Sequence, residues 1–357
     1  MTLKELGYYD NLNVYRKEKS LESFDIARVI TEHKERYNVI GESGEFEAEI
    51  IGNLRFTATS RTDFPAVGDW VAISEYDTNK VLIHAVFPRK TILERQAIDK
   101  NGEKQIIASN IDYALIIQSV DRDFNLNRIE RYLTICNNSG ISSIIILSKI
   151  DLIPESKLQE LMLQVKKRTN KAILIGISNE TKAGIDELKK QIEKGKTYCL
   201  LGSSGVGKST LINQLSEKEL MQTNEISTVT NKGKHTTSHR QLIVLPSGGI
   251  MIDNPGMREL GIADASEGLD KTFEQISSIA ANCRYDNCTH THEKGCAVIH
   301  ALENGDIEQH VFNNYIKLLK EKAHFEASIA EKRQKEKDFG KFVKNFKKDI
   351  KGFSQKR

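Results

Sequence analysis

The sequence predicts a multidomain protein with a small all-β barrel, a central α/β domain and a mainly helical C-terminal domain. Its 357 residues exceed the length of one ordinary domain, so two or three domains are expected. Short strand-like segments fill residues 24–96, and apolar strands alternate with helical stretches over 105–262. From residue 263 onward the apolar residues recur with helical spacing, without a strand pattern. We place the expected domains at 1–98 (with an N-terminal extension), 99–262 and 263–357.

The composition excludes several classes of protein. Hydrophobic residues make up 39% and charged residues 28% of the chain, as in globular proteins. No apolar run approaches the roughly 18 residues that span a bilayer, and the N-terminus lacks the pattern of a secretory signal. Three of the five cysteines lie within residues 283–296, which indicates a metal site in a reducing compartment. We therefore expect a cytoplasmic protein that does not insert into membranes.

The C-terminal tail carries a concentration of positive charge. Residues 331–357 contain eleven Lys or Arg against four Asp or Glu, a net charge of +7, whereas the rest of the chain sums to −4. Aromatic and aliphatic residues recur there every three or four positions, which predicts an amphipathic basic helix. Such a tail favours a polyanionic partner such as nucleic acid, and a solvated helix without a partner is the alternative.

The N-terminal domain is expected to be a barrel of five short strands. Turn residues such as Gly41, Gly44 and Pro65 separate the strand-like segments. Five strands in about 75 residues match a small barrel, for which the OB-fold is a frequent solution. Such barrels often bind oligonucleotides, but a packing or spacer module explains these residues equally well. The strands are expected at Ile26–Ile30, Tyr37–Ile40, Phe46–Ile50, Trp70–Ile73 and Val81–Phe87.

In the central domain, strand and helix patterns alternate. This order argues for a parallel sheet covered by helices, two of which are expected near 127–136 and 155–168. Residues 222–240 contain almost no apolar side chains, so we expect a mobile loop there. The strands are expected at Tyr113–Ile117, Ser143–Leu147, Ala172–Ile177, Tyr198–Leu201, Leu242–Leu245 and Ile250–Ile252.

A phosphate-binding loop is the most specific motif of the chain. GSSGVGKS matches G-x-x-x-x-G-K-[ST] fully, with an apolar strand before it and a helical stretch after it. Glycines let the loop N–H groups face phosphate oxygens, Lys208 adds a charge at the β- and γ-phosphates, and Ser209 offers a hydroxyl to Mg²⁺. The expected nucleotide-binding residues of the loop are Gly202, Ser203, Ser204, Gly205, Val206, Gly207, Lys208, Ser209 and Thr210.

Residues that would read the base follow two earlier strands. Ser148, Lys149 and Asp151 come close to the Asn-Lys-x-Asp signature of guanine-nucleotide proteins. An aspartate there accepts from the ring N–H and the exocyclic amine of guanine, and the lysine stem lies across the base. Serine in place of asparagine shortens one hydrogen-bonding arm. After the next strand, Ser178 and Asn179 would supply a backbone N–H to the guanine oxygen.

The γ-phosphate would be sensed at the end of the last strand. Asp253 follows Ile250–Ile252 and is expected to hold Mg²⁺ through water. Gly256 would bring a backbone N–H close to the γ-phosphate. The base-reading elements thus precede the phosphate loop, and the Asp-x-x-Gly element comes last. This order is a circular permutation of a conventional guanine-nucleotide domain.

A cluster of cysteine and histidine predicts one structural zinc ion. Cys283, Cys288, His290 and Cys296 form C-x₄-C-x-H-x₅-C. Three thiolates and one imidazole complete a tetrahedral Zn²⁺ site with no open position, which is typical of a structural metal. His292 could replace His290 as a ligand, and His300 is a more distant candidate.

Together these motifs resemble the RsgA family of circularly permuted GTPases. The resemblance covers nearly the whole chain and rests on GDWV at 68–71, SKID at 148–151, GSSGVGKST at 202–210, GKHTTSHR at 233–240, DNPGMRE at 253–259 and the Cys/His cluster. It implies an OB domain, a permuted GTPase domain and a zinc domain. It also implies a monomer that binds the small ribosomal subunit and its rRNA during late maturation, and hydrolyses GTP to GDP and phosphate with subunit-stimulated turnover.

The sequence departs from the family pattern at two positions. Ser148 stands where Asn or Thr is commoner, and Asn254 stands where Thr is commoner. Neither change removes an essential charge, so we expect altered affinity rather than lost function.

The residue that orients the attacking water is the open point. Met257 stands directly after the Asp-x-x-Gly glycine, where many GTPases have Gln, and a thioether cannot orient water. The resemblance implies that His235 takes this catalytic role and that Thr236 or Thr237 reaches Mg²⁺. A loop histidine that faces phosphate or RNA is the alternative.

Two other functions remain open from the sequence. One is a different P-loop NTPase, such as an ATPase or a small-molecule kinase, although no Arg-rich lid is evident. The other is an RNA-binding assembly scaffold in which the nucleotide is structural.

Overall fold

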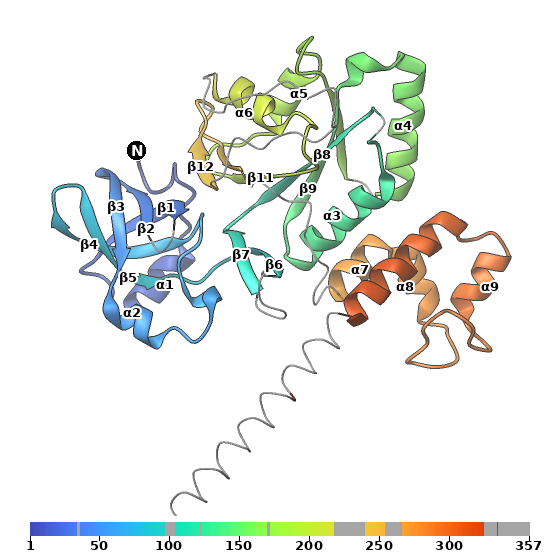
Figure 1. Cartoon of the computed structure of the whole chain (residues 1–357), viewed down its shortest axis with the longest axis horizontal. Coiled ribbons are helices and arrows are strands. Elements are labelled where there is room, and N and C mark those ends of the chain that lie inside the picture. Colours follow the sequence, from blue (N-terminus) through green and yellow to red (C-terminus); the bar gives the residue numbers. More distant parts are fainter. Residues whose placement is uncertain are drawn as a thin grey trace, which may run out of the picture.

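The computed structural model of the chain describes residues 1–33, 36–96, 104–121, 123–169, 172–217, 240–253, 266–324 and 334. A barrel, an α/β domain and a group of helices lie side by side in Figure 1. Of the mobile loop expected over 222–240, residues 222–239 lie outside the described residues, as do residues 254–265 and nearly all of the basic tail.

The five strands expected near the N-terminus are confirmed and form a closed barrel. Their order is β1-β2-β3-β5-β4, and β4 pairs back onto β1. This order is that of an OB-fold, and the side chains that point inward form the core of the barrel. The strands are β1 (Asp25–His33), β2 (Arg36–Gly41), β3 (Gly44–Ile50), β4 (Trp70–Asp77) and β5 (Lys80–Val86).

Several short elements around the barrel were not predicted. Helix α1 (Asn11–Glu18) packs Leu12 against Leu6, Trp70 and Phe87 outside the barrel core. Helix α2 (Gly52–Thr57) and the 3₁₀ turn η1 (Arg61–Asp63) lie between β3 and β4. Strands β6 (Ile92–Gln96) and β7 (Lys104–Ser109) pair as a separate antiparallel ribbon.

The central sheet has the order β10-β9-β8-β11-β13-β12. All neighbours pair in parallel except β12, which is antiparallel to β13, so the expected parallel sheet is confirmed except at β12. Helices cover both faces, with α3 and α4 on one and α5 and α6 on the other (Figure 1). The elements are β8 (Tyr113–Ser119), α3 (Leu126–Asn138), β9 (Ser142–Ser148), η2 (Ile150–Leu152), α4 (Glu155–Arg168), β10 (Ile173–Ile177), α5 (Ile185–Lys190), β11 (Thr197–Leu201), α6 (Lys208–Ser216), β12 (Gln241–Val244) and β13 (Ile250–Asp253).

The barrel and the central sheet are hydrogen-bonded to each other. Thr31 of β1 pairs with Gln241 of β12, so the two sheets are continuous at this edge. Arg28 lies fully buried at the joint, where Nη1 donates to Leu6 O at 2.6 Å and Nη2 to Thr197 Oγ1 at 2.9 Å. Burial lowers the pKa of Arg28 to about 10, so the guanidinium stays charged at neutral pH. Its hydrogen bonds therefore join the N-terminal segment, the barrel and β11.

The GDWV motif reinforces the same joint. The buried Asp69 carboxylate accepts from Arg89 Nε at 2.8 Å and Nη2 at 2.7 Å, and from Ser109 Oγ. Gly68 has φ +94°, and a Cβ there would lie 2.3 Å from Ser109 O. Glycine is therefore required for this close approach of the barrel to β7.

The C-terminal helices pack on α3 and share its apolar core. Leu269 and Tyr315 belong to the same buried cluster as Ile129. A Cβ at Gly268 would lie 2.2 Å from Thr134 O, so glycine allows the close contact of α7 with α3. As expected, no strand occurs among the described residues after 265. The helices are α7 (Ser266–Thr272), α8 (Glu274–Ala280), α9 (Ala297–Glu303) and a helix over 309–324.

Ion pairs add to this apolar contact. Glu130 of α3 accepts from Arg168 Nη2 at 2.6 Å and from Asn314 Nδ2 in the helix over 309–324. Arg131 Nη1 donates to Glu321 at 2.8 Å. Among the described helices, none combines the length and apolar character needed to cross a membrane.

Candidate functional site: a nucleotide-binding edge and a metal-type cluster

The predicted nucleotide-binding residues meet at one edge of the central sheet. Strands β8, β9, β10, β11 and β13 run in parallel, so their carboxyl ends lie together. β8 and β11 are neighbours in the sheet. The chain continues from β8 to β9 toward one edge of the sheet, and from β11 to β12 and β13 toward the other edge. Such a reversal opens a crevice at the carboxyl ends, where open α/β sheets bind their ligands.

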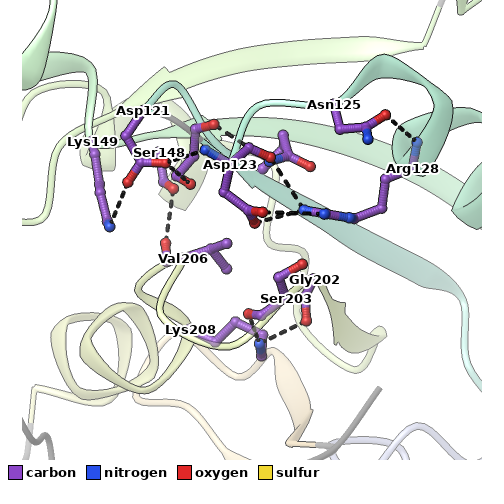
Figure 2. Close-up of polar contacts among 12 residues, drawn as sticks. Asp121, Asp123, Asn125, Arg128, Ser148, Lys149, Gly202, Ser203, Val206 and Lys208 are labelled. Atoms are coloured by element: carbon purple, nitrogen blue, oxygen red, sulfur yellow. Dashed lines mark hydrogen bonds and ion pairs between the residues drawn. The ribbon is translucent and has the colours of Figure 1, made fainter. Parts of the chain in front are cut away.

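The phosphate loop connects β11 to α6 as expected. Gly205 and Gly207 adopt φ +82° and +94°, and Ser209 and Thr210 lie in the first turn of α6. The Lys208 ammonium folds back over the loop, where Nζ donates to Gly202 O at 2.8 Å and to Ser203 O at 2.5 Å (Figure 2). The loop backbone thus curves around the amine that is expected to meet phosphate.

Ile117 of β8 and Asn179, which follows β10, lie close to two of the loop glycines. A Cβ at Gly202 would lie 2.5 Å from Ile117 O, and one at Gly207 would lie 2.6 Å from Asn179 Nδ2. Asn179 Nδ2 also donates to Gly207 O at 3.1 Å, and Asn179 O accepts from Gln214 Nε2 at 2.6 Å. Asn179 therefore lies against the phosphate loop and the helix that follows it.

Replacing Gly207 with alanine is expected to weaken GTP binding at least about tenfold. Gly207 has a left-handed backbone conformation, which costs residues other than glycine roughly 1 kcal/mol. In addition, the new Cβ would collide with the Asn179 side chain. Calorimetric titration with GTP measures the effect. Gly140→Ala is the matched control, because Gly140 has φ +67° but no atom near its Cβ position. Equal loss of GTP affinity in both variants would contradict the importance of the contact.

The base-side residues are joined to the phosphate loop. Ser148 is buried at the end of β9, and its Oγ donates to Val206 O at 2.8 Å (Figure 2). The serine that departs from the family pattern thus holds the loop directly. Ser178 Oγ donates to Asp151 Oδ1 at 2.5 Å, which fixes the carboxylate expected to read guanine. The Ser178 backbone N–H instead donates to Ala183 O at 3.0 Å, so Ser178 acts here through its hydroxyl.

Asp121 belongs to this site, and the sequence reasoning missed it. It follows β8, and its Oδ2 accepts from Lys149 Nζ at 2.9 Å (Figure 2). Burial raises the pKa of Asp121, but hydrogen bonds from Lys149, Asp123 N and Ser119 Oγ outweigh it, so the pKa lies below its ordinary value. The available signal was an acidic residue just after a strand, the same signal that singled out Asp253.

Two of the expected Mg²⁺ residues lie at this edge. Asp253 ends β13 and is 3% exposed, and Ser209 is the second residue of α6. A carboxylate and a hydroxyl are oxygen donors of the kind that Mg²⁺ prefers. His235, Thr236, Thr237 and Gly256 lie outside the described residues, so their expected roles remain predictions.

The second site is the Cys/His cluster of the C-terminal region. The ligand atoms of Cys283, Cys288, His290 and Cys296 all lie within 4.8 Å of one another. Tetrahedral zinc, with Zn–S about 2.3 Å and Zn–N about 2.0 Å, places two sulfurs about 3.8 Å apart and sulfur and nitrogen about 3.5 Å apart. The Sγ atoms of Cys283 and Cys296 are 3.8 Å apart, and His290 Nδ1 lies 3.6 and 3.4 Å from them. The donor set and its spacing therefore fit zinc.

The loop around the cluster selects His290 over the two alternative histidines. His292 Nδ1 lies 2.9 Å from Thr291 Oγ1, and His300 Nδ1 lies 3.1 Å from Asn304 Nδ2, so both are engaged outside the cluster. Glu293 accepts from the backbone N–H groups of Thr289, Thr291 and His292, and hydrogen bonds from Thr289 lower the pKa of this exposed carboxyl. The carboxylate thus shapes the turn that presents His290.

A phosphate loop in the middle of the sheet, preceded along the chain by the strand ends at Ser148 and Ser178 and followed by Asp253, defines a circularly permuted P-loop GTPase. A family model described as RsgA GTPase matches residues 86–263. This chain belongs to the RsgA GTPase family, and the predicted GTP hydrolase class is confirmed by that membership.

Relatives match over nearly their whole length. A small ribosomal subunit biogenesis GTPase RsgA 2 of Lactiplantibacillus plantarum is 42% identical over 304 residues, which cover 84% of each chain. RsgA 1 of Bacteroides thetaiotaomicron is 37% identical over 344 residues, 96% of each chain. The YjeQ structure from Thermotoga maritima matches with a TM-score of 0.63 and 25% identity, covering 83% of this chain and 98% of that one. The YloQ structure, described as a circularly permuted GTPase, matches with a TM-score of 0.59 and 22% identity, covering 84% of this chain and 95% of that one. The expected permuted fold is thereby confirmed.

Proposed function

We propose that this protein is a GTPase that binds the small ribosomal subunit during its late maturation and releases it after hydrolysing GTP. The observation that carries the proposal is the direct bond of Ser148 to Val206, which joins a base-reading strand end to the phosphate loop. The names of the relatives supply the partner, because they describe GTPases of small-subunit biogenesis.

The reaction is the attack of water on the γ-phosphorus. The bond between the γ-phosphorus and its bridging oxygen breaks, and GDP and inorganic phosphate leave. Lys208 supplies positive charge to the β- and γ-oxygens, where negative charge accumulates. Ser209 and Asp253, with Thr236 or Thr237, would hold Mg²⁺, which would neutralise charge on the same oxygens. Gly256 offers a backbone N–H to the γ-phosphate, and His235 orients the water.

Guanine is selected at the other end of the crevice. Asp151 accepts from the ring N–H and the amine of guanine, a pair of donors that adenine lacks. Ser178 holds that carboxylate in place, and the Lys149 stem covers the base. Asn179 completes the pocket beside the phosphate loop.

The outer parts of the chain bind the subunit. The OB barrel, the C-terminal helices and the basic tail are proposed to contact rRNA, with one structural zinc held by Cys283, Cys288, His290 and Cys296. We keep the domain limits at 1–98, 99–262 and 263–357 as part of this proposal. The protein acts as a monomer in the cytoplasm, where thiolate ligands stay reduced.

The proposal predicts that small subunits stimulate hydrolysis. Phosphate release is measured with the protein alone, with isolated small subunits and with isolated large subunits. We expect an increase of at least about tenfold only in the reaction with small subunits, since Met257 cannot orient the water and His235 is proposed to do so once the subunit is bound. Equal turnover in all three reactions would overturn the assignment of the partner. Replacing GTP with ATP should abolish turnover, and equal hydrolysis of both would overturn the base assignment.

A further inference from the structure

Lys149 is held from one side by a carboxylate that belongs to no nucleotide-binding motif. Lys149 has φ +61°, a left-handed conformation that a residue with a side chain adopts at a cost. Its Nζ lies 2.9 Å from Asp121 Oδ2, which comes from the loop after the neighbouring strand β8 (Figure 2). The side chains of Lys149 and Asp121 are 24% and 28% exposed, so solvent screens this pair less than a surface pair.

Asp121 is itself fixed by its own loop. Its Oδ1 accepts from Ser119 Oγ at 2.8 Å and from Asp123 N at 3.1 Å. The carboxylate therefore cannot follow a moving lysine without breaking these bonds. Because the Asp121 carboxylate is fixed, its ion pair with Lys149 restricts the conformations of the long lysine side chain.

The same loop contains a second ion pair that does not touch Lys149. Asp123 Oδ2 accepts from Arg128 Nη1 at 2.6 Å (Figure 2). Gln118 Nε2 donates to Asp123 O at 2.8 Å. These bonds tie the loop to the start of α3. Removing the charge of Asp123 therefore tests the order of the loop without removing the ion pair to Lys149.

We propose that Asp121 is a positioning residue that holds Lys149 over the guanine base. This inference rests on the proposed base site. With the ammonium anchored, the lysine stem is ordered before the nucleotide arrives, so binding loses less side-chain entropy. Because Lys149 touches the base and not the phosphates, Asp121 contributes equally to the affinities for GTP, GDP and inosine triphosphate. Asp151 acts differently, since it also reads the amine that inosine lacks.

The test is Asp121→Asn, which keeps the shape and the Oδ1 acceptor but removes the charge. Calorimetric titration should show affinities for GTP, GDP and inosine triphosphate all weakened about 3- to 10-fold. Asp123→Asn, the matched control in the same loop, should stay within twofold of the wild type. Asp121→Glu should recover part of the loss. A loss shared by Asp121→Asn and Asp123→Asn would show that only loop order matters and would overturn the proposal.

A double-mutant cycle separates this inference from the proposed base site. Lys149→Gln alone should weaken GTP binding, and adding Asp121→Asn to it should have little further effect. If Lys149→Gln weakens binding but Asp121→Asn does not, or if the two losses add, the positioning role is wrong while the base site stands. If Lys149→Gln leaves GTP affinity unchanged, the base site itself is wrong, and the positioning role falls with it.

Discussion

Replacing Lys208 with alanine is expected to lower GTP hydrolysis at least about 100-fold and to weaken GTP binding by a similar factor. Hydrogen bonds to charged groups contribute about 1.5–3 kcal/mol each, and this amine is placed to serve both the β- and the γ-phosphate. In the structure its Nζ sits within the loop, donating to Gly202 O and Ser203 O. Single-turnover hydrolysis and calorimetric titration with GTP measure the two effects.

The control for this variant is another lysine of the same domain. Lys189 on α5 pairs with Glu217 at 3.3 Å and is 40% exposed, so Lys189→Ala should keep both GTP binding and hydrolysis. The unfolding temperature without nucleotide checks that Lys208→Ala is folded. A folded Lys208→Ala protein with turnover within threefold of the wild type would refute the role of this residue in phosphate binding.

Removing one ligand of the Cys/His cluster is expected to cost the protein its metal and the order of the surrounding loop. Cys288→Ser is the sharpest variant, because Cys288 is half-exposed whereas Cys296 is buried and caps α9. Structural zinc in small modules contributes about 10–16 kcal/mol of apparent binding free energy, which is comparable to the stability of a whole domain. The zinc content measured by elemental analysis should fall from one zinc per chain toward zero.

Hydrogen exchange then locates the damage. Amides of residues 283–303 should lose protection in Cys288→Ser and after chelation, while those of β11 and α6 keep theirs. His292→Ala is the control, since its imidazole lies outside the cluster and should leave the zinc content unchanged. Loss of zinc in His292→Ala, or full zinc in Cys288→Ser, would show that the ligand set is wrong.

Much of the fold could be read from local patterns. The five barrel strands and the six strands of the central sheet were predicted, because apolar residues with turn residues between them mark strands along the chain itself. The phosphate loop was equally clear, since its glycines, lysine and serine all lie within one short segment. Helices α3 and α4 followed from their apolar spacing.

The elements that were missed lack such local signals. Helix α1 buries only Leu12 of its own residues, so its apolar face is too narrow to stand out in sequence. Strands β6 and β7 pair with each other across an intervening segment and carry charged or polar residues at Glu94, Arg95, Lys104 and Gln105. Strand β12 was predicted, but its antiparallel direction depends on its partner β13 and on the barrel strand β1.

The site divides in the same way between sequence and tertiary structure. The sequence by itself identified the loop over 202–210, Lys149 and Asp151 as candidates to bind the base, and the cluster of three cysteines, because the residues of each motif lie close together along the chain. The tertiary structure decided which residues meet. It bonded Ser148 to Val206, 58 residues away, and Lys149 to Asp121, and it chose His290 among three nearby histidines. These contacts depend on strand order and loop geometry, which arise from the packing of the whole sheet and not from any one segment.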